Sequence, residues 1–261
     1  LDTPDGKPLG AIGIFLDTTR TQVLERVRRT FVSDLSHEMR TPLASIAAAV
    51  ETLEEAGPLS AEENANLLAI LARNVARLKA LLEDLTDLSK IETGAITLDP
   101  EPVVLAEMVG DVFVSLGALA EAAGVRLLSE VPRDLRIRAD RRRLDQILLN
   151  VVENAIKFNK PGGTVEVFAG LEEERIRIRV EDTGEGIPPA ERELIFRRFH
   201  RVDRSRSRQA GGRGLGLAIV KHLVRLHGGT IRAEPREGGG TSMRLEFPVT
   251  GPALNVRDEA V

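Results

Sequence analysis

Residues 32–53 read VSDLSHEMRTPLASIAAAVETL, and their apolar or small residues recur at alternating intervals of three and four. Such spacing is typical of a helix that presents one apolar stripe to partner helices in a bundle. The stripe consists of positions 32, 35, 39, 42, 46, 49 and 53. Gly57 and Pro58 then end the pattern, and Ser60 is suited to cap a following helix.

A second stripe with the same kind of spacing follows this break. It consists of Leu67, Leu71, Asn74, Leu78, Leu81, Leu85 and Leu88. The two segments therefore predict a helical hairpin. Because two helices alone bury such stripes poorly, we expect two copies of the chain to form a homodimeric four-helix bundle.

The sequence beyond the hairpin predicts an α+β fold. Residues 93–102 (TGAITLDPEP) contain Gly and two Pro and predict a linker. Antiparallel strand pairs then alternate with helices that can all cover one face, which predicts a two-layer α/β sandwich over 103–249. We expect helices near 104–123, 140–158 and 214–227, and strands near 125–131, 135–139, 164–170, 175–181, 229–234 and 241–248. At the two ends, 9–16 (LGAIGIFL) predict a strand of a truncated domain and 250–261 a flexible tail.

The composition of the 261 residues excludes several functional classes. No cysteine is available for a disulfide or a thiolate metal site, and the four histidines lack zinc-ligand spacing. A net charge of −4, with 8 Phe and neither Trp nor Tyr, argues against nucleic-acid binding. No apolar run is long enough to span a membrane. Because residue 1 is Leu, we expect a fragment, with any membrane anchor upstream of it.

His37 is the first candidate for chemistry. It lies two positions, or roughly 200° of helix, past the stripe residue Leu35, and so it faces away from the core. An exposed imidazole followed by the carboxylate of Glu38 is a plausible nucleophile with its own proton acceptor. Thr41 lies one turn beyond His37, where its hydroxyl can reach the same patch. The alternative interpretation is a solvated surface histidine.

A polar face on the helix expected near 140–158 is the second candidate. Asn150, Asn154 and Lys157 share this face, and Glu153 borders it. The two carboxamide oxygens can ligate hydrated Mg²⁺, the lysine can neutralise phosphate, and Glu153 can hold a metal-bound water. The alternative interpretation is the ordinary polar face of an amphipathic helix.

Two glycine-containing loops complete the candidates. In the first, Asp182 is an acceptor suited to an exocyclic amine, and Gly184 and Gly186 let the backbone approach a flat ligand. In the second, 211–217 (GGRGLGL) open a helix whose free N–H groups favour phosphate. Arginines at 197–208 predict a mobile lid over a polyphosphate. The alternatives are a glycine turn for the first loop and, for the arginines, a solvated loop or a docking patch for an acidic partner.

In this order and with these gaps, the motifs resemble those of the sensor histidine kinases of two-component systems. The segment SHEMRTPL at 36–43 resembles their phosphoacceptor box, and 150–157 resembles their N box. Residues 1–17 are similar to the end of a PAS sensor domain, and this arrangement most resembles the phosphate-regulon type. The first glycine box, F box, second glycine box and third glycine box are matched by 182–186, 195–199, 212–216 and 238–241.

The resemblance implies a dimerisation and phosphotransfer hairpin at 18–92 and a Bergerat-type ATP-binding domain at 103–249. It further implies that His37 attacks the γ-phosphorus of ATP and that Glu38 takes the imidazole proton. The phosphoryl group then passes to an aspartate of a response regulator receiver domain, and Thr41 suggests phosphatase activity toward that regulator. The cytoplasmic domains would belong to a protein anchored in the inner membrane.

The resemblance also assigns the ligands. Mg²⁺ is expected at Asn150, Glu153 and Asn154. Contacts to ATP are expected from Asn150, Asn154, Lys157, Asp182, Gly184, Gly186, Phe199, Gly212, Gly214, Leu215, Gly216, Leu217 and Thr241.

Two other functions compete with this one. A signalling scaffold would bind nucleotide as a switch without phosphorylating His37, and the presence of Glu38, Asn154 and Asp182 weighs against it. A stand-alone ATPase of the same nucleotide fold, of the chaperone or mismatch-repair type, would have no reason to carry the hairpin.

Overall fold

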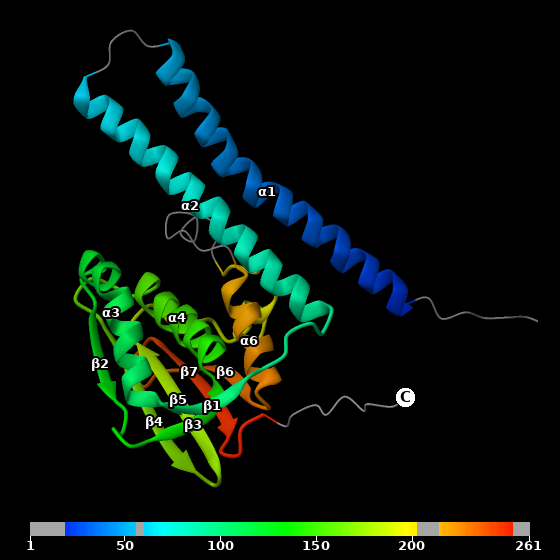
Figure 1. The fold of residues 1–261 in the computed structure, drawn as a ribbon, viewed down its shortest axis with the longest axis vertical. Helices are drawn as coiled ribbons and strands as arrows, with labels where there is room; N and C mark the ends of the chain where they lie inside the picture. The colour runs from blue at the N-terminus through cyan, green and yellow to red at the C-terminus, as the bar shows by residue number, and fades with distance from the viewer. Residues whose placement is uncertain (1–18, 56–59, 203–213, 253–261) are drawn as a thin grey trace, which may run out of the picture.

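The computed structural model describes residues 19–55, 60–202 and 214–252 (Figure 1). It shows a long helical hairpin followed by a mixed α/β domain, which confirms the predicted fold class. The predicted strand at 9–16, Gly212, three lid arginines (Arg204, Arg206 and Arg208) and the tail from 253 onward lie outside the described residues. Within the described residues, no helix combines the length and the apolar character that a membrane span requires.

Helices α1 (Thr19–Glu55) and α2 (Ala61–Glu92) form the hairpin. The cap predicted at Ser60 is present: its side chain accepts from the backbone N–H of Glu63 at 3.2 Å, and Glu63 Oε2 accepts from the Ser60 N–H at 2.9 Å. This reciprocal pair satisfies N–H groups that the first turn of α2 would otherwise leave unpaired. The predicted stripes meet between the helices, where Ala49 and Leu81 are buried.

The hairpin covers only part of its apolar surface. On α1 the predicted stripe positions Val32 and Met39 remain 53% and 40% exposed. On α2 a row that the sequence reading missed, Leu68, Val75 and Leu82, recurs every seven residues and is exposed. A single chain therefore leaves a coiled-coil type of apolar row on each helix without a covering partner.

The second domain is built on a five-stranded sheet in the order β2-β4-β5-β7-β6. Strands β2 and β4 are parallel, and the other neighbours in this sheet are antiparallel. The strands of this sheet are β2 (Arg126–Glu130), β4 (Thr164–Glu172), β5 (Arg175–Asp182), β6 (Thr230–Pro235) and β7 (Thr241–Pro248). Among its described residues, the α-helices of the domain are α3 (Leu105–Ala123), α4 (Arg141–Lys157) and α6 (Gly216–Leu226), and Leu194–Phe196 form a short 3-10 helix.

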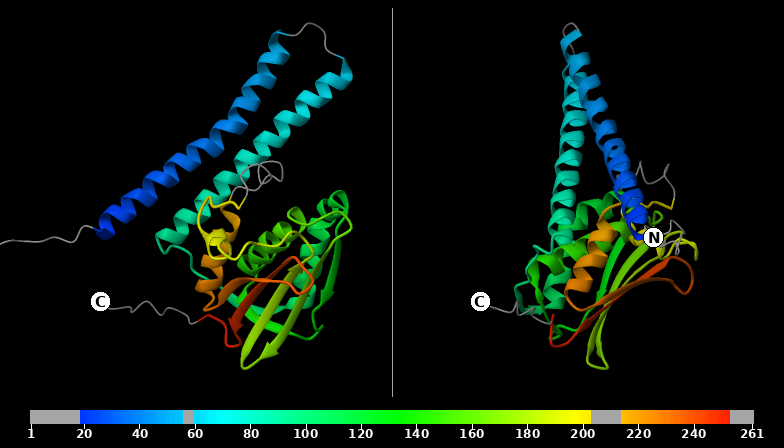
Figure 2. Two further views of the ribbon diagram at one scale, coloured as in Figure 1. Left: turned by 180° about the vertical axis from the view of Figure 1, so that it is seen from behind. Right: turned by 90° about the vertical axis from the view of Figure 1, so that its right-hand side faces the viewer.

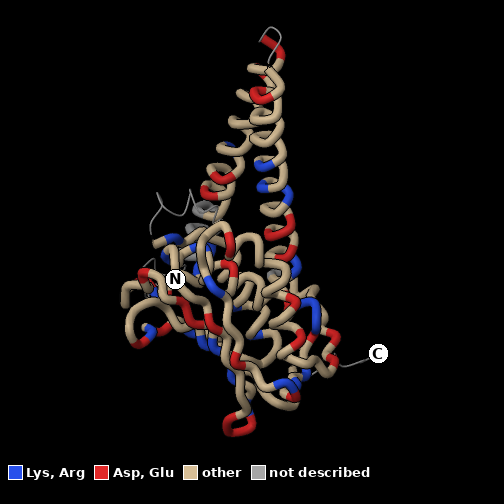
Figure 3. Tube along the Cα trace, turned by 90° about the vertical axis from the view of Figure 1, so that its left-hand side faces the viewer, with Lys and Arg blue, Asp and Glu red and all other residues tan. Residues whose placement is uncertain are grey.

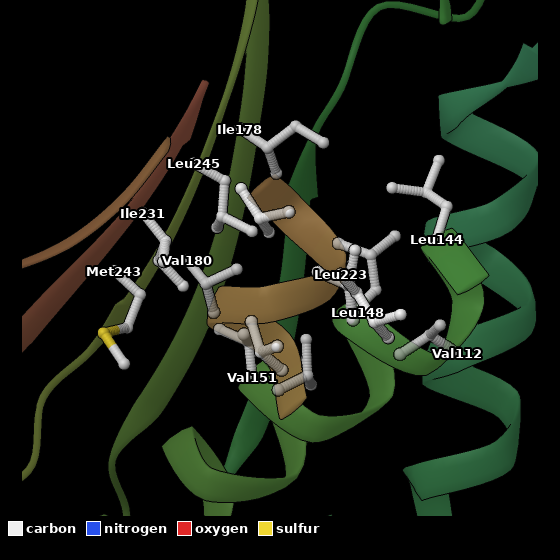
Figure 4. Packing of buried hydrophobic residues seen from close by; sticks show 14 of the residues in the cluster. Val112, Leu144, Leu148, Val151, Ile178, Val180, Leu223, Ile231, Met243 and Leu245 are labelled. Atoms are coloured by element: carbon white, nitrogen blue, oxygen red, sulfur yellow. The ribbon is translucent and has the colours of Figure 1, made fainter. Parts of the chain in front are cut away.

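Helices α3, α4 and α6 cover one face of the sheet, as the two-layer prediction required (Figure 2). The core lies between these layers. The α4 residues Leu144, Leu148 and Val151 are fully buried against it, as are Ile178 and Leu245 of the sheet (Figure 4). Each such side chain contributes about 1.5–3 kcal/mol of burial free energy. The packing fixes α4 by its apolar face and leaves its polar face free to line a site.

The opposite face of the sheet carries charged side chains of both signs. Arg175 and Arg177 on β5 both pair with Glu246 on β7 at 3.6 and 3.4 Å, and Arg179 lies 4.3 Å from the ring centroid of Phe168. Figure 3 shows acidic and basic residues interspersed over the coloured part of the catalytic domain. This pairing lets an open sheet face remain solvated.

One strand was not predicted. The strand β1 (Pro100–Val104) begins within the linker expected at 93–102 and pairs with β3 (Arg136–Asp140) as a separate two-stranded ladder. Pro100 and Pro102 indicated a linker in the sequence, and proline cannot donate a ladder hydrogen bond. In a two-stranded ladder each strand needs only one neighbour, so the missing donors are tolerated.

A buried histidine joins this ladder to α6. His227, 1% exposed, pairs through Nδ1 with the Leu223 carbonyl at 2.8 Å, and its Nε2 accepts from the Asp140 N–H at 3.2 Å. Burial lowers the pKa of His227, which agrees with a neutral ring that donates from one nitrogen and accepts at the other. Asp140 in turn caps α4 by accepting from the Arg143 N–H. The network therefore sets where α4 begins.

Candidate functional site

A cavity of about 380 Å³ lies among α4, the end of β5 and the start of α6. It brings together residues that the sequence reading drew from four separate motifs. The predicted ligand residues that line it are Asn150, Glu153, Asn154, Lys157, Asp182, Gly186, Gly214, Gly216, Leu217 and Thr241.

The polar face of α4 presents its amide oxygens to this cavity. The Asn150 side-chain nitrogen donates to the Gln146 carbonyl at 2.9 Å, and that of Asn154 donates to the Asn150 carbonyl at 2.8 Å. With each –NH₂ group occupied by the backbone one turn earlier, each Oδ1 is turned outward as an acceptor. Neutral oxygens of this kind suit Mg²⁺. Lys157 forms a 2.8 Å ion pair with Glu153, so a cation is held on the same face.

Asp182 lies at the end of β5 and is 7% exposed. Its Oδ1 accepts from the backbone N–H groups of Gly184 at 2.9 Å and Thr241 at 3.2 Å. Burial raises the pKa of Asp182, and the hydrogen bonds from Gly184 and Thr241 oppose that rise. The carboxyl group is thus fixed in one orientation at the cavity wall, as recognition of an amine requires.

The α6 N-terminus approaches α4 closely because glycine stands at its first position. A Cβ at Gly216 would lie 2.5 Å from Asn150 Oδ1, and a Cβ at Gly214, whose φ is +72°, would lie 2.8 Å from the Phe199 Cα. No side chain fits in either place. The positive end of the α6 dipole therefore lies beside the amide oxygens of α4, an arrangement suited to phosphate together with a metal ion. The donor set fits an Mg²⁺–nucleotide complex.

Of the predicted ligand residues that the structure describes, three do not line the cavity. Leu215 is fully buried in the core, and the N–H of Gly184 is used to orient Asp182. Phe199 packs instead against Phe31 of α1, with ring centroids 5.5 Å apart. Its φ of +57° is held by a 2.7 Å hydrogen bond from its N–H to the Gly214 carbonyl. The first two act on the cavity through their neighbours, and Phe199 contacts the hairpin.

On the hairpin, His37 is exposed on α1, as its position relative to the stripe predicted. The Thr41 hydroxyl donates to the His37 carbonyl at 3.4 Å. Glu38 is half-buried and bound on both sides: Oε2 pairs with Arg77 of α2 at 3.1 Å, and Oε1 pairs with Arg201 at 2.9 Å. Arg201 also lines the cavity. The carboxylate next to His37 is therefore linked directly to the cavity rim.

Sequence reasoning missed the residues that connect the two domains. Asp84 of α2 lines the cavity, although it belongs to the hairpin. Three residues further along α2, Asp87 pairs with Arg143 at 3.1 Å and accepts from Gln146 at 2.7 Å. Neither aspartate stands in a recognisable motif, because its role depends on docking between segments far apart in the chain.

Comparisons with known proteins agree with this arrangement. Residues 27–94 match the His Kinase A (phospho-acceptor) domain family, and 139–251 match the family of histidine kinase-, DNA gyrase B- and HSP90-like ATPases. The chain is 33% identical over 258 residues to the sensor histidine kinase WalK of Bacillus subtilis, covering 98% of this chain and 42% of WalK. It is 36% identical over 234 residues to the sensor histidine kinase MtrB of Mycobacterium leprae, covering 88% of this chain and 41% of MtrB. The chain thus spans less than half the length of these relatives.

A solved structure shows the same two-part architecture. Full-length ShkA in complex with AMPPNP superposes with a TM-score of 0.63 at 31% identity, covering 88% of this chain and 46% of ShkA. The phosphoacceptor match falls on α1 and α2, and the ATPase match falls on the domain that holds the cavity. With both domains present in this order and relatives of the same kind over nearly its whole length, the chain belongs to the family of two-component sensor histidine kinases.

Proposed function

We propose that this chain is the kinase core of a sensor histidine kinase that phosphorylates its own His37 from Mg-ATP. One observation carries the proposal: Glu38, the neighbour of His37, is bound by Arg201 on the rim of the cavity that holds Asn150 and Asp182. The phosphoacceptor helix thus lies against the site expected to hold the nucleotide. The corresponding division of the chain is a hairpin at 18–92 and a catalytic domain at 103–249.

The cavity residues divide the work of binding. Asp182 accepts a hydrogen bond from the exocyclic amine of adenine, while Gly186 lets the backbone approach the base. Asn150 and Asn154 hold Mg²⁺ through their amide oxygens, with Glu153 beside them, and Lys157 neutralises phosphate. When bound, Mg²⁺ supplies charge neutralisation of the phosphate oxygens. The α6 N-terminus at Gly216 and Leu217 orients the phosphate chain.

Phosphoryl transfer needs mainly positioning and charge stabilisation. A ring nitrogen of His37 attacks the γ-phosphorus, the bond to the bridging oxygen breaks, and ADP departs with that oxygen. The imidazole proton passes to the carboxylate of Glu38. The resulting phosphoimidazole is a high-energy donor, suited to transfer to an aspartate of a response regulator. Thr41, whose hydroxyl lies one turn from His37, is proposed to orient a water for dephosphorylation of that regulator.

The exposed apolar rows support a dimer as the functional unit. Leu68, Val75 and Leu82 on α2, with Val32 and Met39 on α1, are spaced for helix packing and stay exposed in one chain. We therefore assign them to a homodimeric four-helix bundle. An anchor in the inner membrane, outside this chain, remains a prediction from the family resemblance.

The nucleotide half of the proposal is tested at Asn154. Asn154→Ala removes one amide oxygen from the cavity, so Mg²⁺-dependent ATP binding in a calorimetric titration should weaken and His37 labelling should fall with it. Asn66→Ala, an exposed asparagine on α2, is the matched control and should change neither. Unchanged affinity in Asn154→Ala would refute its metal role. Strong binding without any labelling of the wild-type chain would favour the scaffold.

A further inference from the structure

The Glu38 carboxylate is held in this structure by two guanidinium groups from different parts of the chain. Arg77 belongs to the hairpin, whereas Arg201 reaches it from the catalytic domain. The Arg201 side chain is only 9% exposed, and charge-assisted pairs shielded from water are the strong ones. The proposed proton acceptor of His37 is therefore held by a residue of the domain that should deliver the phosphate.

Arg201 also lines the nucleotide cavity, so its charge lies between Glu38 and the expected position of the nucleotide. A polyphosphate in the cavity would attract the same guanidinium that now binds Glu38. The docked hairpin further contributes Asp84 to the cavity wall. Docking of the hairpin and binding of a phosphate chain thus make opposite demands on the charges of one site.

The docked arrangement has its own support away from the cavity. Asp87 on α2 binds Arg143 and Gln146 on α4, and the Arg143–Asp87 pair is mostly buried, with side chains 13% and 19% exposed. Phe31 of α1 also packs on Phe199 of the catalytic domain. These contacts favour docking without involving the ligand, so a bound nucleotide must shift the docking equilibrium against them.

We propose that Arg201 is a positioning residue with two alternative partners, the Glu38 carboxylate in the docked arrangement and the phosphate chain of the nucleotide in the cavity. Nucleotide binding then releases Glu38 for proton transfer, and hairpin docking weakens nucleotide binding. By thermodynamic linkage, docking weakens nucleotide binding by the same free energy by which nucleotide weakens docking. The proposal rests on the proposed function for the identity of the ligand, but its test does not require phosphorylation.

The first test weakens docking at a point remote from the cavity. Asp87→Asn removes the carboxylate that pairs with Arg143, and Asp111→Asn is the matched control because Asp111 pairs at 3.2 Å with Arg141, within the catalytic domain. We expect the dissociation constant of Mg-AMPPNP to fall about tenfold in Asp87→Asn. Apparent affinity is proportional to the fraction of chains that are undocked, and this substitution increases that fraction. The control should leave it unchanged.

Two comparisons assign this effect to Arg201. Adenosine has no phosphate chain, so its affinity should be the same in Asp87→Asn and in the wild type. In an Arg201→Gln background, Asp87→Asn should no longer tighten AMPPNP binding by the same factor, because the shared partner is gone. An equal gain for adenosine and AMPPNP, or a full gain without Arg201, would overturn the exchange.

The second test measures docking itself. The chain has no cysteine, so spin labels can be attached specifically at Glu62→Cys on the exposed start of α2 and Glu173→Cys on the exposed turn between β4 and β5. Mg-AMPPNP should broaden and shift the distance distribution, and adenosine should not. Phosphorylation of His37 with an unchanged distribution would overturn the exchange and leave the kinase standing. A shifted distribution without phosphohistidine would support the exchange and refute the kinase activity.

Discussion

Replacing Asp182 by Asn changes one atom of the base-recognition site and leaves its shape intact. Oδ1 accepts from two backbone N–H groups, those of Gly184 at 2.9 Å and Thr241 at 3.2 Å. An asparagine side chain must keep its oxygen in that place and turn its –NH₂ group to the position of Oδ2. The amine of adenine then meets a donor where it had met a carboxylate.

The size of the effect follows from the lost bond. A hydrogen bond to a charged group contributes about 1.5–3 kcal/mol, so ATP affinity should fall by about 10- to 150-fold in Asp182→Asn. GTP presents a carbonyl oxygen where ATP presents the amine, and that oxygen can accept from the new –NH₂ group. The preference for ATP over GTP should therefore collapse, whereas a general loss of the site would weaken both nucleotides.

Calorimetric titrations measure the affinities for ATP and GTP, and thermal unfolding serves as the control for stability. Burial raises the pKa of Asp182, so the folded chain holds this proton more readily than the unfolded chain does. The stability contribution of the group therefore falls as pH rises through its folded pKa, and Asp182→Asn removes that cost. We expect an equal or higher Tm at pH 7. Unchanged ATP affinity, or equal losses for ATP and GTP, would refute base recognition by Asp182.

Other variants test the metal face, a buried histidine and the dimer. Gly216→Ala forces a methyl group against Asn150 Oδ1, so Mg-ATP affinity in a titration should fall about tenfold. Unchanged affinity would show that the close approach of α6 to α4 is not needed for nucleotide binding. Burial lowers the pKa of His227, so below about pH 6.5 the free energy of unfolding of the wild type should fall by up to about 1.4 kcal/mol per pH unit. His227→Gln should lose less stability over the same pH range. An equal pH dependence of thermal unfolding in the two proteins would contradict this. Leu82→Glu should raise the dimer dissociation constant measured by sedimentation more than about tenfold. Val114→Glu, at an exposed position on α3, should leave it unchanged. An unchanged dissociation constant in Leu82→Glu would refute the interface.

Periodicity predicted most of the fold because most elements bury one face. The alternation in β5 places Ile176, Ile178 and Val180 inward, and the 3,4 spacing of the hairpin helices buries Ala49 on α1 and Leu81 on α2. Capping chemistry is equally local, which is why Ser60 and Asp140 mark helix starts in both the sequence and the structure. The β1 strand escaped prediction because its pairing with β3, and not its composition, determines its conformation.

Many residues of the cavity could be predicted from local motifs, but the connection of the cavity to the hairpin could not. Asn150, Asn154 and Asp182 belong to motifs with local signatures, and the structure brings them to one cavity. The Arg201–Glu38 bond joins positions 163 residues apart, and the Arg143–Asp87 pair joins positions 56 apart. An arginine or an aspartate on a solvated helix has no pattern that names its partner, so such contacts emerge only from the packing of domains.

Phosphorylation of His37 is the result on which the kinase assignment stands or falls. The wild-type chain and His37→Gln would be incubated with γ-³²P-ATP and Mg²⁺, the label tested for acid and base stability, and ATP binding titrated for both. We predict an acid-labile, base-stable label on the wild type and none on His37→Gln, with ATP affinity equal in the two. An acid-stable label, or an acid-labile one that persists in His37→Gln, would contradict the account.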